Sequence, residues 1–486
     1  MMNKSDKLTI HRLHPISILY FMVAAIKESL SFIWVFPLIV LFVHEKIGDQ
    51  ISTLIINVTA GSLIILLFLV VAGLKWQAFT YQIQEKGIYI ETGVFVTKKR
   101  WVTSDRIQSL DSTVRVYDHL FSTRTLTIEL AGGKESSIIL SCISKEEEQR
   151  IRQVLYEYNK DKLGESGKES GLQLSNKDLI VHSLLSPKFG IVFTFLCLGL
   201  LKYWDITKGE DRDTLFTYLA SWLGSNWIFT TVTLMILLSF ALSLFLTYVS
   251  DYHFKLDKNE RGEIEIQQGL FEKKHRTIAQ HRIQAIFITE RPLQRLLGYA
   301  SIEAVVIQNS QDEQVKKTIS LIPFVKKDRV QSLIEIFTGY ERSNNLHTPP
   351  KKARISYVGP LFLIGCLLLI PSWMYIPEPY HYFSLIIPIL SLWLGWREYR
   401  TTGWNQSERF LTLQYGVFFR NTAIIKRGRI QWIALRQTWL QERKHLASIN
   451  MAVTSGKEKV KVSLHHIPYE EAMHIYQCTL KKKEET

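Results

Sequence analysis

Long apolar runs alternate with polar, strand-like segments along the whole chain. Four runs contain no Lys, Arg, Asp or Glu, and they cover residues 51–74, 227–249, 356–376 and 380–396. A helix needs roughly 20 mainly apolar residues to cross the hydrocarbon core of a bilayer. Each of these runs therefore predicts a membrane-spanning helix.

Two further apolar runs carry charges. Residues 16–43 include Lys27 and Glu28, and residues 184–204 include Lys188 and Lys202. We interpret residues 15–26 as an interfacial helix before a span that starts near residue 30. The second run is interpreted as a span that starts near residue 189, with Lys202 reaching the interface. A re-entrant or surface helix is the alternative for each, and with both spans the six form three pairs.

The polar segments after the pairs share one pattern, in which Arg-Ile-Gln occurs three times. A Gly followed by an apolar residue and Phe lies thirteen residues before each Arg, and a Ser or Thr that opens an apolar run lies nineteen residues after it. Such recurrence at constant spacing indicates a repeat of about 90 residues, longer than solenoid repeats. The marker residues, for which we expect a structural role, are Gly93, Arg106, Ile107, Gln108, Gly269, Arg282, Ile283, Gln284, Gly416, Arg429, Ile430 and Gln431.

The content of each copy predicts strands followed by one helix. Residues 81–95, with the sequence YQIQEKGIYIETGVF, alternate like a β-hairpin. Ser144 and Glu147 fit a capping box at the start of the closing helix of the first copy, and Pro323 could begin that of the second. On a strand the Arg and Gln of each marker would share one face while Ile enters the core. The fold class is therefore an α+β integral membrane protein with three tandem units.

Each unit is expected to be a transmembrane helical hairpin followed by a cytoplasmic antiparallel β-barrel with a C-terminal helix. Residues 160–178 are rich in Gly, Ser and charges and predict a flexible tether. The predicted segments are an N-terminal cytoplasmic or interfacial segment 1–27, hairpin 28–75, domain 76–160, flexible linker 161–186, hairpin 187–249, domain 250–342, linker 343–354, hairpin 355–396, domain 397–480 and a charged tail 481–486.

Charge predicts the orientation. The chain has a net charge of +14, yet the turns inside the three pairs hold only Lys46, Lys208 and Arg212. The positive-inside rule then places both termini and all three domains in the cytoplasm, in a multi-pass protein of the cell membrane. No cleavable signal peptide is expected. The four cysteines suit a reduced setting, so we expect no disulfides.

The second copy carries the clearest family likeness. Residues 291–306, RPLQRLLGYASIEAVV, follow HRIQAI and resemble the bacterial pleckstrin-homology-like (DUF304) membrane protein family, YdbT-type, with three PH-like domains. The first copy has Ser122 where RLLG has its Gly, and the third lacks the paired leucines. The resemblance implies two near-orthogonal antiparallel sheets closed by a helix. It also implies a partner such as a shorter single-domain relative, and a link to envelope stress or antimicrobial-compound resistance.

Signatures of catalysis are absent from the sequence. It contains no G-x-x-x-x-G-K-[ST], no H-E-x-x-H and no paired C-x-x-C. His465 and His466 are adjacent, and neighbouring residues of a strand face opposite ways, so they would chelate a metal poorly. We therefore expect no enzyme activity, no cofactor, no metal and no nucleic acid partner.

Basic clusters follow two of the marker glycines, and membrane lipids are therefore candidate partners. Cationic side chains beside a membrane attract anionic headgroups, whereas a solvated strand is the structural alternative. The candidate lipid contacts are Lys98, Lys99, Arg100, Lys273, Lys274 and Arg276. We expect a membrane-anchored scaffold or accessory subunit for protein and/or anionic lipid binding. The alternative function is a transport or lipid-handling component of the membrane.

Overall fold

The computed structural model describes most of the chain in two compact units. Unit 1 comprises residues 1–167 and 271–277, and unit 2 comprises residues 168–270 and 278–486; each is described by itself. The start of the first predicted span and the turns within the first two pairs lie outside the described residues. The described residues are 10–29, 53–84, 87–130, 137–157, 171–186, 188–206, 221, 227–259, 262–307, 318–343, 345–375, 377, 380–454 and 459–484.

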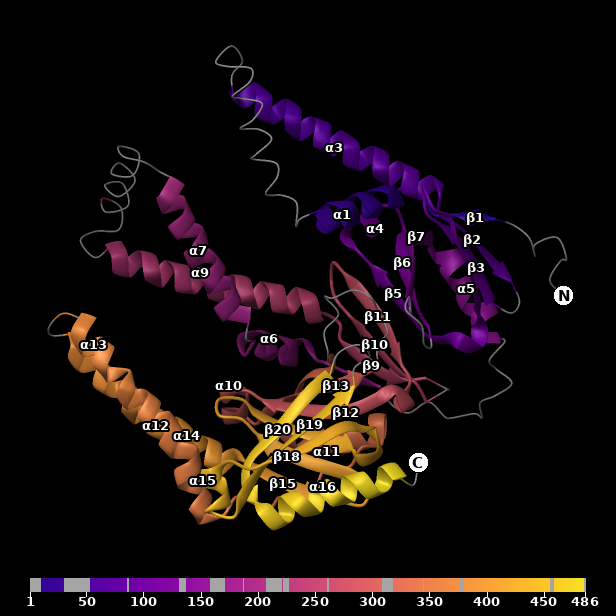
Figure 1. The fold of residues 1–486 in the computed structure, drawn as a ribbon. Helices are drawn as coiled ribbons and strands as arrows, with labels where there is room; N and C mark the ends of the chain where they lie inside the picture. The colour runs from indigo at the N-terminus through magenta and orange to yellow at the C-terminus, as the bar shows by residue number, and fades with distance from the viewer. Residues whose placement is uncertain are drawn as a thin grey trace. The chain divides into compact units, whose positions relative to one another are not determined.

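The three copies have the same order of elements (Figure 1). Copy 1 contains β2 (Thr80–Gln84), β3 (Gly87–Thr92), β4 (Lys98–Thr103), η4 (Ser104–Arg106), β5 (Ile107–Val114), α4 (Val116–Leu120), β6 (Thr123–Leu130), β7 (Ser137–Ser144) and α5 (Lys145–Glu157). Copy 2 contains β9 (Lys255–Lys258), β10 (Ile264–Gln268), β11 (Lys273–Ile278), η6 (Gln280–Arg282), β12 (Ile283–Glu290), α10 (Pro292–Leu296), β13 (Tyr299–Val306), β14 (Ile319–Lys326) and α11 (Lys327–Thr338). Copy 3 contains β15 (Gly403–Gln406), β16 (Phe410–Tyr415), β17 (Arg420–Lys426), η9 (Arg427–Arg429), β18 (Ile430–Arg436), α15 (Trp439–Glu442), β19 (Leu446–Thr454), β20 (Lys459–Pro468) and α16 (Tyr469–Glu484).

All the pairings between these strands that the structure describes are antiparallel. Unit 1 holds the sheet β1-β2-β3-β4 and the strand order β7-β6-β5-β11. Unit 2 holds β8-β9-β10, β14-β13-β12-β17-β16-β15 and β18-β19-β20. The predicted hairpin of residues 81–95 is confirmed, because β2 pairs with β3 from Thr80↔Glu91 to Gln84↔Gly87. The α+β class and the helix at the C-terminal end of each copy are also confirmed, whereas closure of a barrel stays a prediction.

Each copy begins earlier than the sequence suggested. The short strands β1 (His11–Arg12) and β8 (Leu172–Gln173) pair with β2 and β9, and His347 forms an isolated bridge with Trp404 of β15. Helices α1 (Ser17–Ser29) and α6 (Asn176–Leu184) follow the two short strands, and the turn η7 (Lys351–Ala353) follows the bridge. A flexible linker was therefore the wrong prediction for residues 171–186. After each short strand or bridge the chain continues into apolar helices, and it then returns to the same sheet.

One local prediction needs correction. Pro323 lies within β14, not at a helix start, and the closing helix α11 begins at Lys327. β14 is the last strand of its sheet, where a missing N–H is tolerated. The predicted tail is helical as far as Glu484, where α16 ends.

The Arg of each marker precedes its strand instead of lying on it. Arg106, Arg282 and Arg429 end the 3-10 turns η4, η6 and η9, and the following Ile begins β5, β12 or β18. Ile283 and Ile430 are buried, as expected for core residues, whereas Ile107 is half-buried against the core of copy 1. The Arg429 guanidinium donates to the carbonyl of His281 in copy 2, at 3.1 Å. The structural role of the marker residues stays a prediction.

The marker glycines form the turn between the second and third strands of each copy. Their φ angles are 109° at Gly93, 108° at Gly269 and 113° at Gly416, a region that favours glycine. A Cβ at Gly416 would collide with the carbonyl oxygen of Phe419. This explains why glycine recurs at this position.

Gly416→Ala should therefore destabilise unit 2 by about 1–3 kcal/mol, the range for a side chain held in a strained backbone conformation. Gly428→Ala is the matched control, because a Cβ there meets no atom within 4 Å. Thermal unfolding of the full-length protein in detergent measures both. Equal stability of the two variants would contradict the turn argument.

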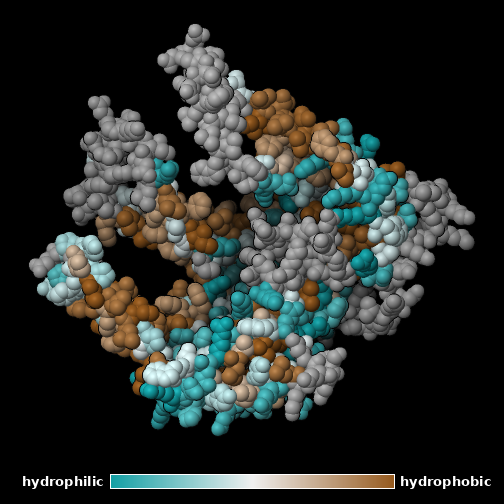
Figure 2. Space-filling model, viewed as in Figure 1, coloured by the Kyte–Doolittle hydropathy of each residue, from teal (hydrophilic) through white to brown (hydrophobic). Residues whose placement is uncertain are grey.

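The apolar runs form helices that expose large hydrophobic side chains. They are α3 (Thr53–Gln77), α7 (Lys188–Ile206), α9 (Trp227–Asp251), α12 (Arg354–Leu367), α13 (Leu369–Tyr375) and α14 (Ile386–Thr401), with η8 (Tyr380–Leu385) before α14. Brown side chains cover much of them in Figure 2. Among the described residues, Phe229–Asp251 and Lys351–Tyr375 are long and apolar enough to cross a membrane. Helices α6 and α7, bent by 50°, would make a third span if they count as one.

The last apolar pair packs closely. α12 and α14 run side by side, away from the strands of copy 3 (Figure 1). A Cβ on Gly395 would lie 2.7 Å from the Cα of Val358, and one on Gly365 would meet the side chain of Ser391. Glycine at these positions lets the two backbones approach, as is common between membrane helices. The predicted run 380–396 is divided between η8 and α14, so the hairpin in every unit stays a prediction.

Candidate interaction surface

Copies 2 and 3 are joined by strand pairing within unit 2. β12, which follows the marker Arg of copy 2, pairs antiparallel with β17 of copy 3. The register runs from Ala285↔Ile425 to Glu290↔Arg420. Glu290 is the eighth residue after the marker Arg of its copy, and Arg420 is the fourth after the marker Gly. The result is one sheet of six strands to which both copies contribute.

This sheet separates two hydrophobic cores. Ile286 and Ile288 of β12 lie in the core of copy 2, together with Ile424 of β17. Ala285 and Phe287 of the same strand β12 lie in the core of copy 3. Each copy therefore completes the core of the other, and the junction is a packed interface as well as a ladder of backbone hydrogen bonds.

A buried carboxylate adds an ionic contact at the junction. Glu290 is 1% exposed, and its carboxylate lies 3.8 Å from the guanidinium of Arg420 and 3.6 Å from the ammonium of Lys327. Burial lowers the pKa of Arg420, while the charge of Glu290 raises it. Arg420 also donates to the side-chain oxygen of Gln414 at 2.7 Å. A buried carboxylate that keeps its cationic partners constrains the geometry of the junction. Removal of one partner is strongly destabilising, because it leaves a buried charge uncompensated.

Unit 1 contains a second junction with the same register. Within it β5 of copy 1 pairs with β11, from Val114↔Lys273 to Ser112↔His275. Val114 is again the eighth residue after its marker Arg, and Lys273 the fourth after its marker Gly. The backbone N–H of Thr277 donates to the carboxylate of Asp111 at 3.0 Å. In copies 1 and 2 the strand after the marker thus receives the third strand of the following copy, in the same register.

Two strands that correspond to the junction strands lie at the edges of their sheets. Among the described strands, β18 of copy 3 has one neighbour, β19, and β4 of copy 1 has one neighbour, β3. Trp432 of β18 is 41% exposed, whereas Ala285 at the same position of β12 is 0% exposed. Trp101 of β4 is 42% exposed, whereas Ile424 at the same position of β17 is 0% exposed. Both tryptophans occupy positions that a junction buries.

The basic residues of copy 1 lie on β4. Lys98 and Lys99 are exposed and Arg100 is half-buried. The Lys99 ammonium lies 3.2 Å from the carboxylate of Glu91. Hydrogen bonds from Tyr89 and then from Lys99 lower the pKa of Glu91, and the bond to Glu91 raises the pKa of Lys99. Part of the positive charge on β4 is thus already balanced within the copy.

The basic residues of copy 2 lie on β11. Lys273 is exposed, while Lys274 and Arg276 are half-buried. The Lys274 ammonium lies 3.6 Å from the carboxylate of Glu272. At the corresponding positions β17 has one basic residue, Arg420, which serves the junction with copy 2. The candidate lipid-contact residues therefore lie on the third strand of their copies, and in copies 2 and 3 this strand also pairs with the preceding copy, which sequence reasoning did not foresee.

The turns before these strands are attached to apolar helices. In unit 2 the backbone N–H of Leu270 donates to the carbonyl of Val249, at the end of the candidate span in α9. In copy 3 the guanidinium of Arg397, on α14, donates to the carbonyl of Val417 at 2.9 Å. Phe418 then follows with 51% exposure, and Phe95 of the copy 1 turn is 98% exposed. An exposed aromatic residue at the end of an apolar helix is suited to a membrane interface.

One repeated residue was missed by the sequence analysis. Asp118, Gln294 and Gln441 each lie twelve residues after a marker Arg and are almost fully buried. Each side chain accepts a hydrogen bond from the backbone N–H that starts its short helix, at 2.9, 3.3 and 2.9 Å. The matching spacing of polar residues was the signal that could have revealed them. Their role is to fix the turn between the two strands that follow the marker.

The adjacent histidines of copy 3 have separate local contacts. The ring Nδ1 of His466 lies 2.9 Å from the side-chain nitrogen of Gln441, and the carbonyl of His465 accepts from the hydroxyl of Tyr357. Burial lowers the pKa of His466 to about 4, with smaller effects from His465 and Lys444. Within the described part of the chain no group of three His, Cys, Asp or Glu side chains could hold a metal ion. The four cysteines are free.

Comparison with known proteins agrees with the threefold architecture. The family model described as Bacterial PH domain matches residues 32–159, 214–339 and 359–481. The chain belongs to the bacterial PH domain family. It is also 25% identical to the UPF0699 transmembrane protein YdbT of Bacillus subtilis (strain 168), over 96% of this chain and 97% of that protein. The likeness to a transmembrane protein supports the membrane location that the apolar helices suggest.

The departures from the family pattern fall at one turn. Ser122, Gly298 and His445 lie sixteen residues after their marker Arg, and their φ angles are 53°, 73° and 50°. All three PH-like copies therefore keep the left-handed turn, although only copy 2 has glycine there. The substitution of Gly by Ser or His in the other copies leaves the fold unchanged.

Proposed function

We propose that this bacterial PH domain protein is a membrane-anchored scaffold or accessory subunit that acts by binding and not by catalysis. The observation that carries the proposal is the β12–β17 junction, where one PH-like copy receives a strand of another and shares its core. Strand addition of this kind is a general mode of peptide and protein recognition. The positive-inside pattern supports a multi-pass arrangement with the copies in the cytoplasm.

Photocrosslinking in native membranes tests the scaffold proposal. A photoreactive amino acid replaces either Trp432 or Trp101 in the full-length protein, and Trp373, 54% exposed on α13, serves as the control position. A scaffold should give one defined protein product from a strand position and none from the control. If neither strand position yields a protein product, the proposal is overturned.

Anionic lipid is a second candidate ligand, favoured by the turns that join the apolar helices. These turns combine exposed Phe residues with the basic positions that follow them. Juxtamembrane Lys and Arg contribute about 1 kcal/mol each toward anionic lipid at low salt. Lys99 and Lys274 already have carboxylate partners, so less than the full sum is expected.

Replacing the six basic candidates by Gln should therefore lower the anionic lipid retained by the purified full-length protein at least tenfold at low salt. The six are Lys98, Lys99, Arg100, Lys273, Lys274 and Arg276. Mass spectrometry of co-purified lipid measures the effect. Gln at Lys145, Lys326 and Arg329, which are exposed at the starts of closing helices, provides the control. Unchanged retention in the six-residue variant would exclude these residues as lipid contacts.

A further inference from the structure

We infer that β18 receives β4 of a second copy of this chain, so that chains pair head to tail through their PH-like copies. The inference rests on the scaffold proposal and names its partner. It applies the register of the two junctions within the chain to a third junction, which lies between two chains. That register places Arg436 opposite Lys98, Ile433 opposite Trp101, and Trp432 opposite Val102. All of these residues lie on the terminal strands of their sheets.

The same strand positions show what such a contact would bury. At the junction in unit 2, Ile286 opposes Ile424 and both are 0% exposed. The matching residues are Ile433, which is half-buried beside the core of copy 3, and Trp101, which is 42% exposed. A tryptophan at this position would cover the open side of that core. Trp432 would in turn lie against the copy 1 core around Val102.

Strand edges of this length are costly to leave exposed. A terminal strand presents backbone donors and acceptors in a row and pairs readily with another chain. Proteins commonly block such edges with proline or inward charges. β18 carries neither: its residues from Ile430 to Leu435 are uncharged and include Trp432 and Ile433. The edge is therefore suited to receive a strand.

The pairing pattern within the chain indicates that the occupant of this edge is a second copy of the chain. β5 and β12 each receive the third strand of the next copy along the chain. Copy 3 is the last of the three copies that the family model matches, and β4 is the third strand that ends a sheet among the described strands. A contact between unlike surfaces of identical chains is heterologous, so it generates rings or rows of molecules.

Disulfide trapping between two differently tagged chains tests the inference in membranes. One chain carries Arg436→Cys and the other Lys98→Cys. At the corresponding position of the unit 2 junction, the Thr289 hydroxyl and the Asn421 side-chain oxygen are 3.0 Å apart, so the two side chains meet across the strands. A disulfide needs Cα atoms about 4.4–6.8 Å apart, which directly paired strands provide. Each single variant and a chain with Arg443→Cys in α15 provide the background.

The expected result is a disulfide-linked product carrying both tags, at least tenfold above the Arg443→Cys control. Trp432→Asp in the Arg436→Cys chain should reduce that product at least tenfold, because it places a charge on the paired strand. Its total amount and thermal unfolding report whether the variant remains folded. A folded variant that still forms the full product would overturn the inference.

Two other outcomes would also overturn the inference. If a chain carrying both cysteines forms the bond within itself and no mixed product appears, the chain closes on its own β4. If no bond forms in either format, β18 does not receive β4. In both cases a product with another protein in the photocrosslinking experiment would leave the scaffold proposal intact. Loss of both signals would reject the two together.

Discussion

Replacing Ile424 by alanine should destabilise copy 2, although Ile424 belongs to copy 3. Its side chain is 0% exposed and lies in the core of copy 2 through the β12–β17 pairing. Truncation of a buried Ile to Ala costs about 2–5 kcal/mol, depending on how far the neighbours close the cavity. Because both copies contribute to the sheet, the loss of stability should affect the cores on both of its faces.

Hydrogen exchange of the full-length protein in detergent measures this effect. The amides of β13 in copy 2 should exchange faster in Ile424→Ala, together with those of β19 in copy 3. Phe418→Ala, at an exposed site of the same copy, should leave both unchanged. Faster exchange confined to copy 3 would show that the copies fold independently and that the shared core contributes little.

The repeat itself could be predicted from the sequence, because its markers have local structural causes. The marker glycines occupy a turn with φ near 110°, and the Ile after each marker Arg begins a strand. Both requirements act within a few residues, so they recur at fixed spacing. Of the capping box predicted at Ser144 and Glu147, the structure shows one hydrogen bond, in which the Ser144 hydroxyl accepts from the backbone N–H of Glu147 at 3.2 Å.

The junctions between copies could not be predicted in the same way. The pairing of Glu290 with Arg420 joins residues far apart in the sequence, and neither residue has the same type in all three copies. Periodicity reports which face of a strand is apolar, but it does not identify the strand that lies beside it. The short strand at Leu172 was missed for a related reason. It has two residues and lies in a segment rich in Gly, Ser and charges.

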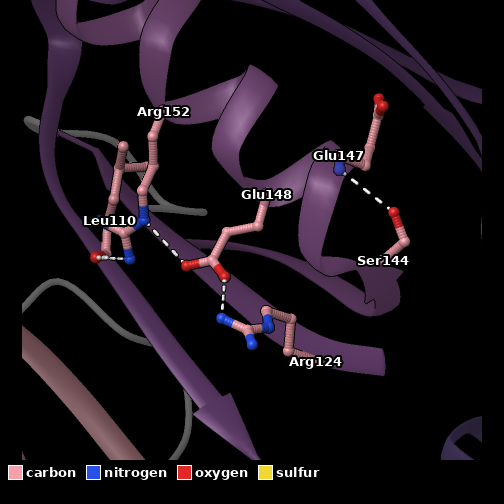
Figure 3. Close-up of polar contacts among 6 residues, drawn as sticks. All are labelled: Leu110, Arg124, Ser144, Glu147, Glu148 and Arg152. Atoms are coloured by element: carbon pink, nitrogen blue, oxygen red, sulfur yellow. Dashed lines mark hydrogen bonds and ion pairs between the residues drawn. The ribbon is translucent and has the colours of Figure 1, made fainter. Parts of the chain in front are cut away.

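Replacing Glu148 by alanine should destabilise unit 1 by about 3–5 kcal/mol, the cost of leaving buried charges without their partner. The carboxylate is about 5% exposed and accepts from Arg124 at 2.7 Å and from Arg152 at 2.8 Å, as Figure 3 shows. Arg152 also donates to the carbonyl of Leu110 at 3.1 Å, so it links the closing helix α5 to β5. Without Glu148, the two guanidinium groups would repel each other beside the core.

The pH dependence separates this charge effect from a packing effect. Burial alone would raise the pKa of Glu148, but the hydrogen bonds from Arg124 and Arg152 dominate and lower it below its ordinary 4.5. A carboxyl whose pKa is lower in the folded state contributes stability above its unfolded pKa and loses it as pH falls through the folded value. The difference in stability between the wild type and Glu148→Gln should thus be constant from pH 7 to about 5 and shrink below about 4.5.

Hydrogen exchange measures this difference. The amides of β6 and α5 are followed in the full-length protein at pH 7 and pH 4, and the rates are corrected for intrinsic exchange. Gln153→Ala, an exposed substitution on the same helix, should have little effect at either pH. A difference between the wild type and Glu148→Gln that stays the same at both pH values would assign the loss to packing. A difference that shrinks at pH 4 would show that the two ion pairs hold the closing helix on copy 1.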